Sequence, residues 1–256
     1  MKAIILAAGM GTRLRPLTDS RPKCLVELHG KPLIDYQIDT LRSAGIEDIH
    51  VVGGYLAHML ERPGITLHVN PEFDTTNMVF TLFQAEKVLD SESDVIVSYG
   101  DIVYEKSVLD TVLGCKADLC VAADKDWLRY WEARMDNPLD DVETFKVTPE
   151  GFIMELGAKP KTLTDIQGQF MGLMKFQAHS LNKLIEFKEN MESALPRDSW
   201  RSLYMTDFVT ALIRAGWPVK AAFTRNGWLE VDSVDDLTLG HLDSSKEFFD
   251  PEKTRT

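Results

Sequence analysis

The order of apolar runs and glycines at the N-terminus constrains the fold of this chain more than any other feature. Residues 2–7 (KAIILA) form a short apolar run followed by Gly9 and Gly11, which is typical of a buried parallel strand that ends in a loop. Residues 32–44 have helical spacing of apolar side chains, and residues 49–52 predict a second strand. This order predicts a right-handed β-α-β unit in a mainly parallel sheet, where ligands bind at the carboxyl ends of the strands.

Later segments extend this pattern and then change it. The runs at 144–147 and 152–156 flank Pro149-Glu150-Gly151 and predict a hairpin rather than another β-α-β unit. Further strands are expected at 66–69, 94–99, 118–124, 168–176, 219–223 and 228–231, and further helices at 77–89, 179–191 and 204–215. No linker divides the chain, so we expect one α/β domain over residues 1–256 with a mixed, mainly parallel central sheet.

The charge balance limits the partners of the chain. It has 40 acidic and 28 basic side chains and a net charge of -12, which disfavours binding to nucleic acid or to an anionic membrane surface. No segment approaches the roughly 18 apolar residues of a bilayer-spanning helix, and residues 3–8 are too short for a signal peptide. We expect a cytoplasmic protein, in which Cys24, Cys115 and Cys120 are free thiols because they lack zinc-site or disulfide-framework spacing.

Two cations stand close to the glycine loop in the sequence. Gly9 and Gly11 let backbone N–H groups approach phosphate oxygens, but the loop lacks the third glycine of the dinucleotide fingerprint and the Lys-Ser/Thr pair of the P-loop. Arg13 follows Gly11 by two residues, and Lys23 comes directly after Pro22. Negative charge must be neutralised when a nucleophile attacks an α-phosphorus, so Arg13 and Lys23 are the predicted catalytic residues.

Two aspartates follow predicted strands and are candidate metal ligands. Asp101 comes after the strand at 94–99, and Asp232 after the strand at 228–231. Carboxylate oxygens are the ligands that Mg²⁺ prefers, so the expected cofactor is Mg²⁺ held by Asp101 and Asp232. The other reading of Asp232 is a helix cap, because Ser233 and the acids after it are typical of a helix start.

The stretch LAAGMGTRLRPLTDSRPKCLVELHGKPLIDY resembles the N-terminal signature of the sugar-nucleotidyltransferase superfamily, and Gly100-Asp101, Ala158-Lys159-Pro160 and Leu229 to Asp232 resemble its later motifs. The resemblance implies a Rossmann-like three-layer sandwich, a nucleoside triphosphate on the glycine loop, and attack of a phosphorylated acceptor on the α-phosphate with release of pyrophosphate. It also implies that Lys159 holds the acceptor phosphate, although Ala158 stands where the family usually has an acid. A homodimer is common in the family.

The middle of the chain resembles one branch of this superfamily, the cytidylyltransferases for phosphocholine, aminoethylphosphonate and phosphoglutamine. The carrying residues are Gly53 to Leu56, Thr76 to Val79, Ser98 to Tyr104, and the tryptophan-rich pattern from Trp127 to Thr144. The branch implies CTP as the nucleotide and a role in capsule or cell-surface polysaccharide modification. The resemblance as a whole implies nucleotide contacts by Leu6, Ala7, Ala8, Gly9, Gly11, Thr12, Arg13, Lys23, Gly54, Asn77 and Gly100.

The acceptor is expected to bind in the second half of the chain. Residues 1–115 are then mainly the nucleotide-binding half, residues 116–245 mainly the acceptor-binding half, and residues 246–256 a tail in which disorder is expected. The candidate acceptor-binding residues are Lys159, Arg129, Arg134 and Glu143. Trp127, Tyr130, Trp131 and Arg134 share one helical face, which suits a small anionic acceptor but equally suits a plain core-facing helix.

Two other functions stay open at the level of sequence. One is a pyrophosphorylase that makes nucleoside-diphosphate sugars from a sugar 1-phosphate. The other is a regulatory protein that binds nucleotide without turning it over. The joint presence of Arg13, Lys23, Asp101 and Asp232 argues against the regulatory protein, because a pure sensor does not need the whole set.

Overall fold

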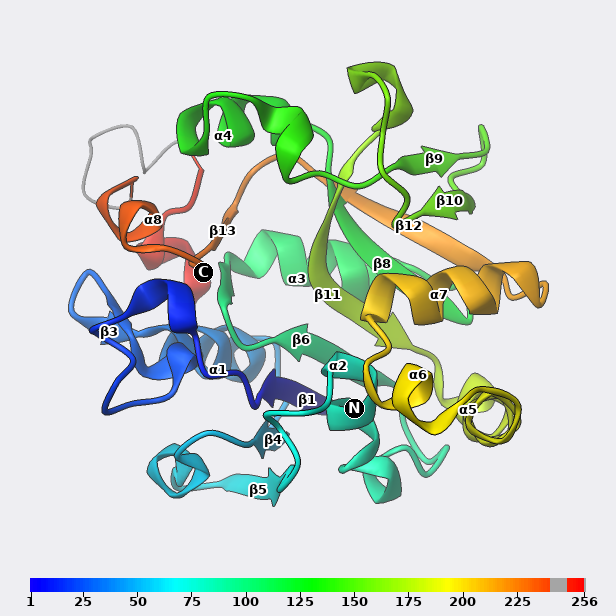
Figure 1. Cartoon of the computed structure of the whole chain (residues 1–256), viewed down its shortest axis with the longest axis horizontal. Helices are drawn as coiled ribbons and strands as arrows, with labels where there is room; N and C mark the ends of the chain where they lie inside the picture. The colour runs from blue at the N-terminus through cyan, green and yellow to red at the C-terminus, as the bar shows by residue number, and fades with distance from the viewer. Residues whose placement is uncertain (240–247, 256) are drawn as a thin grey trace.

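The computed structural model describes residues 1–239 and 248–255 and is built around a twisted seven-stranded sheet (Figure 1). The strand order is β12-β8-β11-β6-β1-β4-β5, and β11 alone runs antiparallel to its two neighbours. The strands are β1 Lys2–Ala7, β4 Asp48–Gly53, β5 Ile65–Val69, β6 Val95–Tyr99, β8 Leu119–Asp124, β11 Gln169–Phe176 and β12 Val219–Thr224. The predicted mixed, mainly parallel sheet and its N-terminal β-α-β unit are confirmed.

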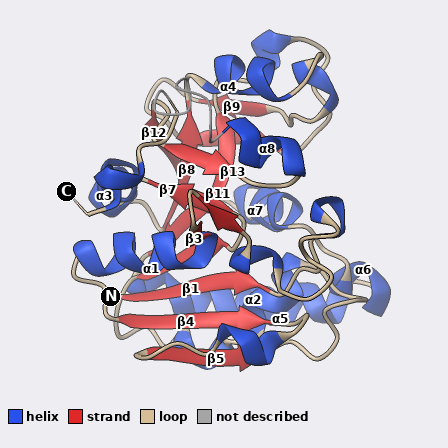
Figure 2. Cartoon of the chain, turned by 90° about the vertical axis from the view of Figure 1, so that its left-hand side faces the viewer, coloured by secondary structure: helices blue, strands red, loops and turns tan. Residues whose placement is uncertain are grey.

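Alternation along the strands divides the core into two layers of side chains. On β1, Ile5 packs into the core on one face of the sheet and Ile4 into the core on the other, and both are fully buried. Figure 2 shows β1, β4 and β5 as neighbouring arrows that point the same way, with helices on both sides of the sheet. This is the expected three-layer arrangement.

The helices fall into two groups according to the face that they cover. Helices α1 Leu33–Ser43, α3 Lys106–Gly114 and α4 Trp127–Arg134 pack on the Ile5 face. Helices α2 Met78–Phe83, α5 Leu181–Ala194, α6 Arg197–Arg201 and α7 Met205–Arg214 pack on the Ile4 face, and the short helix α8 spans Val234–Leu239. Within the described residues, no helix combines the length and apolar character needed to cross a bilayer.

Three small antiparallel ribbons complete the structure. The predicted hairpin is confirmed as β9 Phe145–Val147 and β10 Ile153–Leu156, and β2 Glu27–Leu28 pairs with β3 Lys31–Pro32. The predicted strand at 228–231 is β13 Trp228–Glu230, but it does not join the main sheet. It pairs instead with β7 Ile102–Tyr104, a strand that periodicity alone did not predict.

The helices that differ from the sequence-based expectation include the one after Asn77, α3 and α6. The expected helix at 77–89 stops at Phe83, because the next hydrogen bonds span three residues instead of four and form a 3-10 turn at Glu86–Val88. Helix α3 was not predicted, although its buried Val108, Leu109 and Val112 have helical spacing.

The cysteines and the C-terminus also differ from the expectation. Cys115 and Cys120 form a disulfide, because the short connection between α3 and β8 brings their Cα atoms to 6.1 Å, and Cys24 is the free, buried thiol. The expected tail at 246–256 lies partly outside the described residues. Its described part, 248–255, is ordered by packing, with Phe249 buried against Tyr36 of α1.

Candidate active site

The glycine loop after β1 brings Lys23 back to the sheet edge. Gly11 has a φ of 63°, in the left-handed region that favours glycine, and it precedes the 3-10 helix Thr12–Leu14. A Cβ atom on Gly11 would lie 2.8 Å from Cβ of Lys23, too close for two carbon atoms. The Thr18 hydroxyl donates to the Gly11 carbonyl at 2.7 Å. Gly11 is therefore needed for the close approach of the Lys23 segment to the loop.

The end of β6 lies against the end of β1 in the same way. The Gly100 N–H donates to the Leu6 carbonyl at 2.8 Å, and a Cβ on Gly100 would lie 2.7 Å from that oxygen. Any larger residue would push the two strand ends apart. Because Gly100 permits this contact, Asp101 directly follows the sheet edge where the glycine loop begins.

The β13–β7 ribbon brings Asp232 to the same place from a distant part of the sequence. Glu230 pairs with Ile102, and the Val231 N–H donates to the Asp101 carbonyl at 2.9 Å. The chain then turns into α8, where Asp236 accepts hydrogen bonds from the backbone N–H groups of Asp232 and Ser233. Asp236 therefore serves as the cap of this turn, which leaves the Asp232 carboxylate to point elsewhere.

The predicted catalytic cations and metal ligands form one charged cluster. The Lys23 ammonium donates to Oδ2 of Asp101 at 2.6 Å and also to Oδ1 of Asp232. The Arg13 guanidinium pairs with Oδ2 of Asp232 at 3.0 Å, and its side chain is 67% exposed while that of Asp232 is only 11% exposed. Arg13 thus covers the outer side of the cluster and Lys23 lies inside it.

The electrostatics of the cluster keep Lys23 charged. Burial by itself would lower the pKa of the Lys23 ammonium, but the carboxylates of Asp101 and Asp232 outweigh that effect and raise its pKa above the usual value. Burial would raise the pKa of Asp232, yet the pKa is lowered, first by Lys23 and then by Arg13. Lys23 is therefore positively charged at neutral pH in spite of its burial.

A third carboxylate, that of Glu230, belongs to the cluster and was missed by the sequence analysis. One oxygen from each of Asp101, Glu230 and Asp232 lies within 4.8 Å of the other two. Burial and then the charge of Asp232 raise the pKa of Glu230 to about 8, against the opposing effect of Arg134. The spacing of Glu230 and Asp232 was the available signal for this residue, since residues two apart in an extended segment share a face.

These residues fit a divalent cation. Three carboxylates converge, and Oδ1 of Asp101 is buried and accepts no hydrogen bond within the described part of the chain. A buried carboxylate oxygen without a partner is costly unless a cation or a donor binds it. Hard oxygen donors of this kind suit divalent metal ions such as Mg²⁺.

A small cavity of about 160 Å³ lies on one side of the cluster. All of its lining residues come from positions 6 to 101. They include eight of the residues predicted to bind nucleotide or metal: Leu6, Ala7, Ala8, Gly9, Lys23, Asn77, Gly100 and Asp101. Cys24, Phe73, Thr76, Met78, Thr81 and Tyr99 complete the lining.

The other residues predicted to bind nucleotide are not in the lining of this cavity. Gly11, Thr12 and Arg13 lie in the loop beside it. Gly54 lies behind the loop, where a Cβ would be 2.8 Å from the Ala8 carbonyl and 2.5 Å from Cβ of Phe73. The structure therefore gives Gly54 a packing role under the loop, because neighbouring atoms fill the space that a side chain would need.

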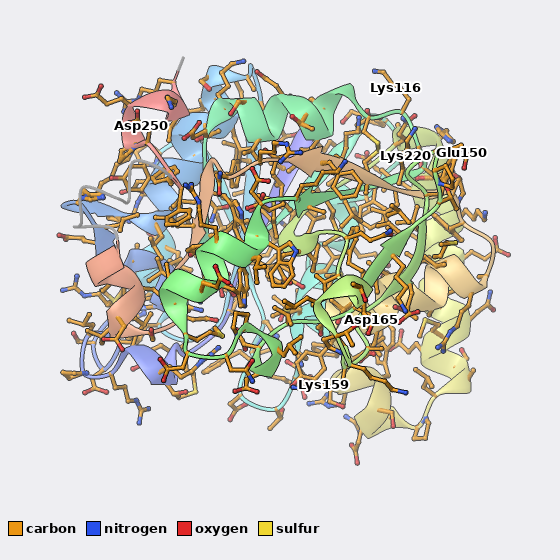
Figure 3. All side chains as sticks on the ribbon, turned by 90° about the horizontal axis from the view of Figure 1, so that it is seen from above. Lys116, Glu150, Lys159, Asp165, Lys220 and Asp250 are labelled. Atoms are coloured by element: carbon orange, nitrogen blue, oxygen red, sulfur yellow. A yellow bond between two sulfur atoms is a disulfide. The ribbon has the colours of Figure 1, made fainter. Side chains whose placement is uncertain are left out.

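A larger cavity of about 450 Å³ lies on the other side of the cluster and includes Glu230 and Asp232 in its lining. Lys159 and Glu143, both predicted to bind the acceptor, are in this lining. Lys159 is exposed, lies at the periphery of the molecule in Figure 3, and donates to the Asp140 carbonyl at 3.3 Å. Glu143 is less exposed, and burial raises the pKa of its carboxyl group.

Arg134, which we predicted to bind the acceptor, does not line the larger cavity. Its side chain is only 4% exposed and is paired with Asp236 at 2.9 Å and Glu230 at 3.0 Å. Arg129 is also absent from the lining of the larger cavity and lies over the ring of Phe248, 4.8 Å from its centroid. Helix α4 turns Trp127, Tyr130 and Trp131 toward the core. Arg129 and Arg134 therefore make contacts within the protein.

The aromatic side chains of α4 are mainly core. Trp127, Tyr130 and Trp131 are buried, and Tyr130 packs edge-on against Trp228 of β13. Of these α4 aromatics, only Trp131 also lines the larger cavity. The core-facing reading of this helix is therefore the correct one for Trp127 and Tyr130.

Comparison with known proteins places this geometry in a family. Residues 3–145 match the model of the MobA-like NTP transferase domain. The chain is 41% identical over 250 residues to CTP:phosphoglutamine cytidylyltransferase of Campylobacter jejuni, a match that covers 93% of this chain and 98% of the relative.

Solved structures agree with this assignment. The inositol-1-phosphate CTP transferase from T. maritima superposes with a TM-score of 0.75 at 20% identity, over 99% of this chain and 96% of that one. The CTP:phosphocholine cytidylyltransferase from Streptococcus pneumoniae superposes with a TM-score of 0.70 at 25% identity, over 93% of this chain and 96% of that one. This chain therefore belongs to the MobA-like NTP transferase domain family, within the sugar-nucleotidyltransferase superfamily, and is a nucleotidyltransferase.

Proposed function

We propose that this enzyme is a CTP-dependent cytidylyltransferase that joins CMP to a small phosphorylated or phosphonate compound and releases pyrophosphate. The observation that carries the proposal is the position of Lys23, Asp101 and Asp232 between two cavities. The 41% identity to a cytidylyltransferase for phosphoglutamine over almost the whole chain supports CTP and a non-sugar acceptor. The small cavity would hold the nucleotide and the larger one the acceptor.

The chain's own residues supply most of the chemistry. A phosphate or phosphonate oxygen of the acceptor attacks the α-phosphorus of CTP, the bond from that phosphorus to the bridging oxygen breaks, and pyrophosphate leaves. Lys23 is held charged and inside the cluster, where it can neutralise the negative charge that develops on the α-phosphate. Arg13 covers the outer side, where the leaving pyrophosphate would gain from a guanidinium.

Asp101 and Asp232, with Glu230 beside them, would hold Mg²⁺. Bound there, the ion would neutralise phosphate charge and help to align the two substrates. The unpartnered Oδ1 of Asp101 supports this assignment, because the ion would supply the missing contact.

The larger cavity favours an acceptor that carries an ammonium group. Asp140, Asp141 and Glu143 line it, and Lys159 is the single lysine or arginine among its described lining residues. Lys159 would bind the phosphate or phosphonate group, and Glu143 with the aromatic rings of Tyr204 and Phe170 would attract the cation of the acceptor.

Two residues that line this cavity each have a buried polar atom without a hydrogen-bond partner within the described residues. These atoms are the Trp131 indole N–H, a donor, and Oε1 of Gln169, an acceptor. Buried polar atoms are normally hydrogen-bonded, so an acceptor molecule with polar groups would supply the partners that these atoms lack. A zwitterionic phospho-compound satisfies all of these features better than a sugar phosphate, which is an anion without an ammonium group.

A pyrophosphate-release assay would test the proposal. CTP, UTP, dTTP, ATP and GTP are each combined with Mg²⁺ and with phosphocholine, aminoethylphosphonate, phosphoamino acids or sugar 1-phosphates. Phosphoethanolamine and ethyl phosphate are added as a matched pair of acceptors, because the two differ by one amine. We expect CTP with an amine-bearing acceptor to be the best pair. A sugar 1-phosphate as the best acceptor would contradict the proposed acceptor class, and no release with any pair would contradict the catalytic function.

Two further parts of the proposal are a homodimer, which the family resemblance supports, and a cytoplasmic location, which was expected from the sequence. Analytical ultracentrifugation over a range of protein concentrations would test the homodimer, and a single monomeric species throughout would contradict it.

A further inference from the structure

The turn that carries Asp101 is very short, and it is flanked by one buried and one partly buried carbonyl. Gly100 and Asp101 alone connect β6 to β7, so the carbonyls of Tyr99 and Ile102 flank the metal-site aspartate on both sides. Buried carbonyls need hydrogen-bond donors. A donor that binds both of these carbonyls also fixes the position of the turn between them.

One side chain, that of Gln37, meets both carbonyls. Its Nε2 donates to the Tyr99 carbonyl at 2.9 Å and to the Ile102 carbonyl at 2.7 Å. Gln37 belongs to α1 and is completely buried in a helix face on which most side chains are apolar. Both amide hydrogens are thus used on the two sides of one turn, which an apolar residue of the same size could not do.

The amide of Gln37 is itself oriented. The Ser98 hydroxyl, also fully buried, donates to Oε1 of Gln37 at 2.7 Å, which directs the NH₂ group toward the turn. Ser98 of β6 therefore orients the Gln37 side chain, and Gln37 in turn holds the end of β6 by its hydrogen bonds. Every hydrogen-bonding atom of the Gln37 amide has a partner in this small network.

We infer that Gln37 is a positioning residue for the catalytic metal: by clamping the carbonyls on both sides of Gly100-Asp101, it fixes the Asp101 carboxylate toward Lys23, Glu230 and Asp232. The inference rests on the proposed metal-dependent function. A two-residue turn without this clamp could shift or rotate, and a carboxylate displaced by about 1 Å binds a metal ion less well.

The test compares Gln37→Met with a matched variant, Thr40→Val. Thr40 is on the same buried face of α1, and its hydroxyl donates to the carbonyls of Tyr36 and Tyr104, away from the Asp101 turn. Both substitutions keep the side-chain size and remove buried hydrogen bonds. Electron paramagnetic resonance follows Mn²⁺ binding to the full chain without substrates, and thermal unfolding measures stability.

We expect Gln37→Met to weaken Mn²⁺ binding by about 10-fold or more and Thr40→Val by less than about twofold, in line with the 10- to 100-fold cost of removing groups that orient metal ligands. Both variants should lower the unfolding temperature, and Mn²⁺ binding is compared at a temperature at which both are folded. The Mg²⁺ concentration for half-maximal pyrophosphate release should rise with Gln37→Met in the same proportion, while the KM for the acceptor stays unchanged.

A second variant tests the network. Ser98→Ala should also weaken Mn²⁺ binding, but by less than Gln37→Met does. The double variant should bind Mn²⁺ as well as Gln37→Met alone, because the serine acts through the glutamine. Equal Mn²⁺ affinity of the Gln37→Met and Thr40→Val variants would overturn the inference. If Gln37→Met weakens Mn²⁺ binding as expected but no transfer from CTP occurs, the inference stands and the proposed reaction fails. Absence of Mn²⁺ binding in the unsubstituted protein would overturn the metal site and this inference together.

Discussion

The two cavities beside the Lys23 cluster are built in different ways. The smaller one is lined by residues 6 to 101 and consists largely of strand ends, small residues and the glycine loop. The larger one takes most of its lining from residues 131 to 232, and its polar groups come from side chains on separate segments: Glu143, Lys159, Thr206 and Glu230.

The difference shows which kind of binding site can be predicted from one short stretch of sequence. A triphosphate can be bound by backbone N–H groups and a few cations, so a contiguous motif is sufficient. An acceptor of specific shape needs side chains that converge from several segments. In this second region Arg134, one of the two arginines predicted to bind the acceptor, is paired inside the protein, and most charged residues of the cavity lining are acids. Four predictions sharpen this contrast.

The largest effect is expected from Lys23→Met, which removes the buried positive charge of the cluster. We expect kcat to fall by about 10²- to 10³-fold, the usual cost of removing one group that stabilises transition-state charge. Pyrophosphate release with CTP measures it. Lys31→Met is the control, since Lys31 forms a partly buried ion pair with Asp39 away from the site. Turnover within a few-fold of the unsubstituted enzyme would contradict the assigned role of Lys23.

Asp232→Asn should have an effect of similar size that depends on the metal ion. The neutral amide keeps the shape of the side chain but loses the charge that attracts a divalent cation, so we expect turnover to fall by about 10²-fold and the Mg²⁺ requirement to rise. Asp235→Asn, an exposed change nearby in α8, should have no such effect. The same Mg²⁺ requirement in the two variants would argue against a metal-binding Asp232.

Arg134→Met separates structure from acceptor binding. Removal of a buried cation leaves Asp236 and Glu230 without their partner, so we expect the free energy of unfolding to fall by about 3 kcal/mol, measured by urea denaturation. Arg129→Met is the matched change on the exposed side of α4 and should cost about 1 kcal/mol or less. Equal stability of the two variants would contradict the structural role of Arg134.

The smallest effect is expected from Glu143→Gln and is confined to the acceptor. Loss of one carboxylate facing an ammonium group should raise the KM for an amine-bearing acceptor by about 10-fold, equivalent to about 1.4 kcal/mol, and leave the KM for CTP unchanged. Initial rates at varied concentrations of each substrate measure both constants. An equal rise in KM for ethyl phosphate, which has no amine, would show that Glu143 does not recognise the cation.

Local pattern was enough for much of the fold. The β1-α1-β4 unit, the strand before Asp101 and the β9–β10 hairpin all follow from apolar periodicity and turn residues within short windows. The pairing of β13 with β7 joins residues more than a hundred positions apart, and no window of sequence contains that information. The same pairing puts Glu230 into the cluster, which is why that residue was missed.

By itself, the sequence determined the strand, the glycine loop and the pair of cations, because each depends on neighbours along the chain and on the conformational freedom of glycine at Gly11. The tertiary structure decided which charged residues face a substrate. The Arg134 side chain, at the end of α4, is buried and paired with Asp236. Gly54 packs behind the loop, and Glu230 turns toward Asp101. A side chain's role depends on what is packed around it, and that is fixed only when distant strands pair.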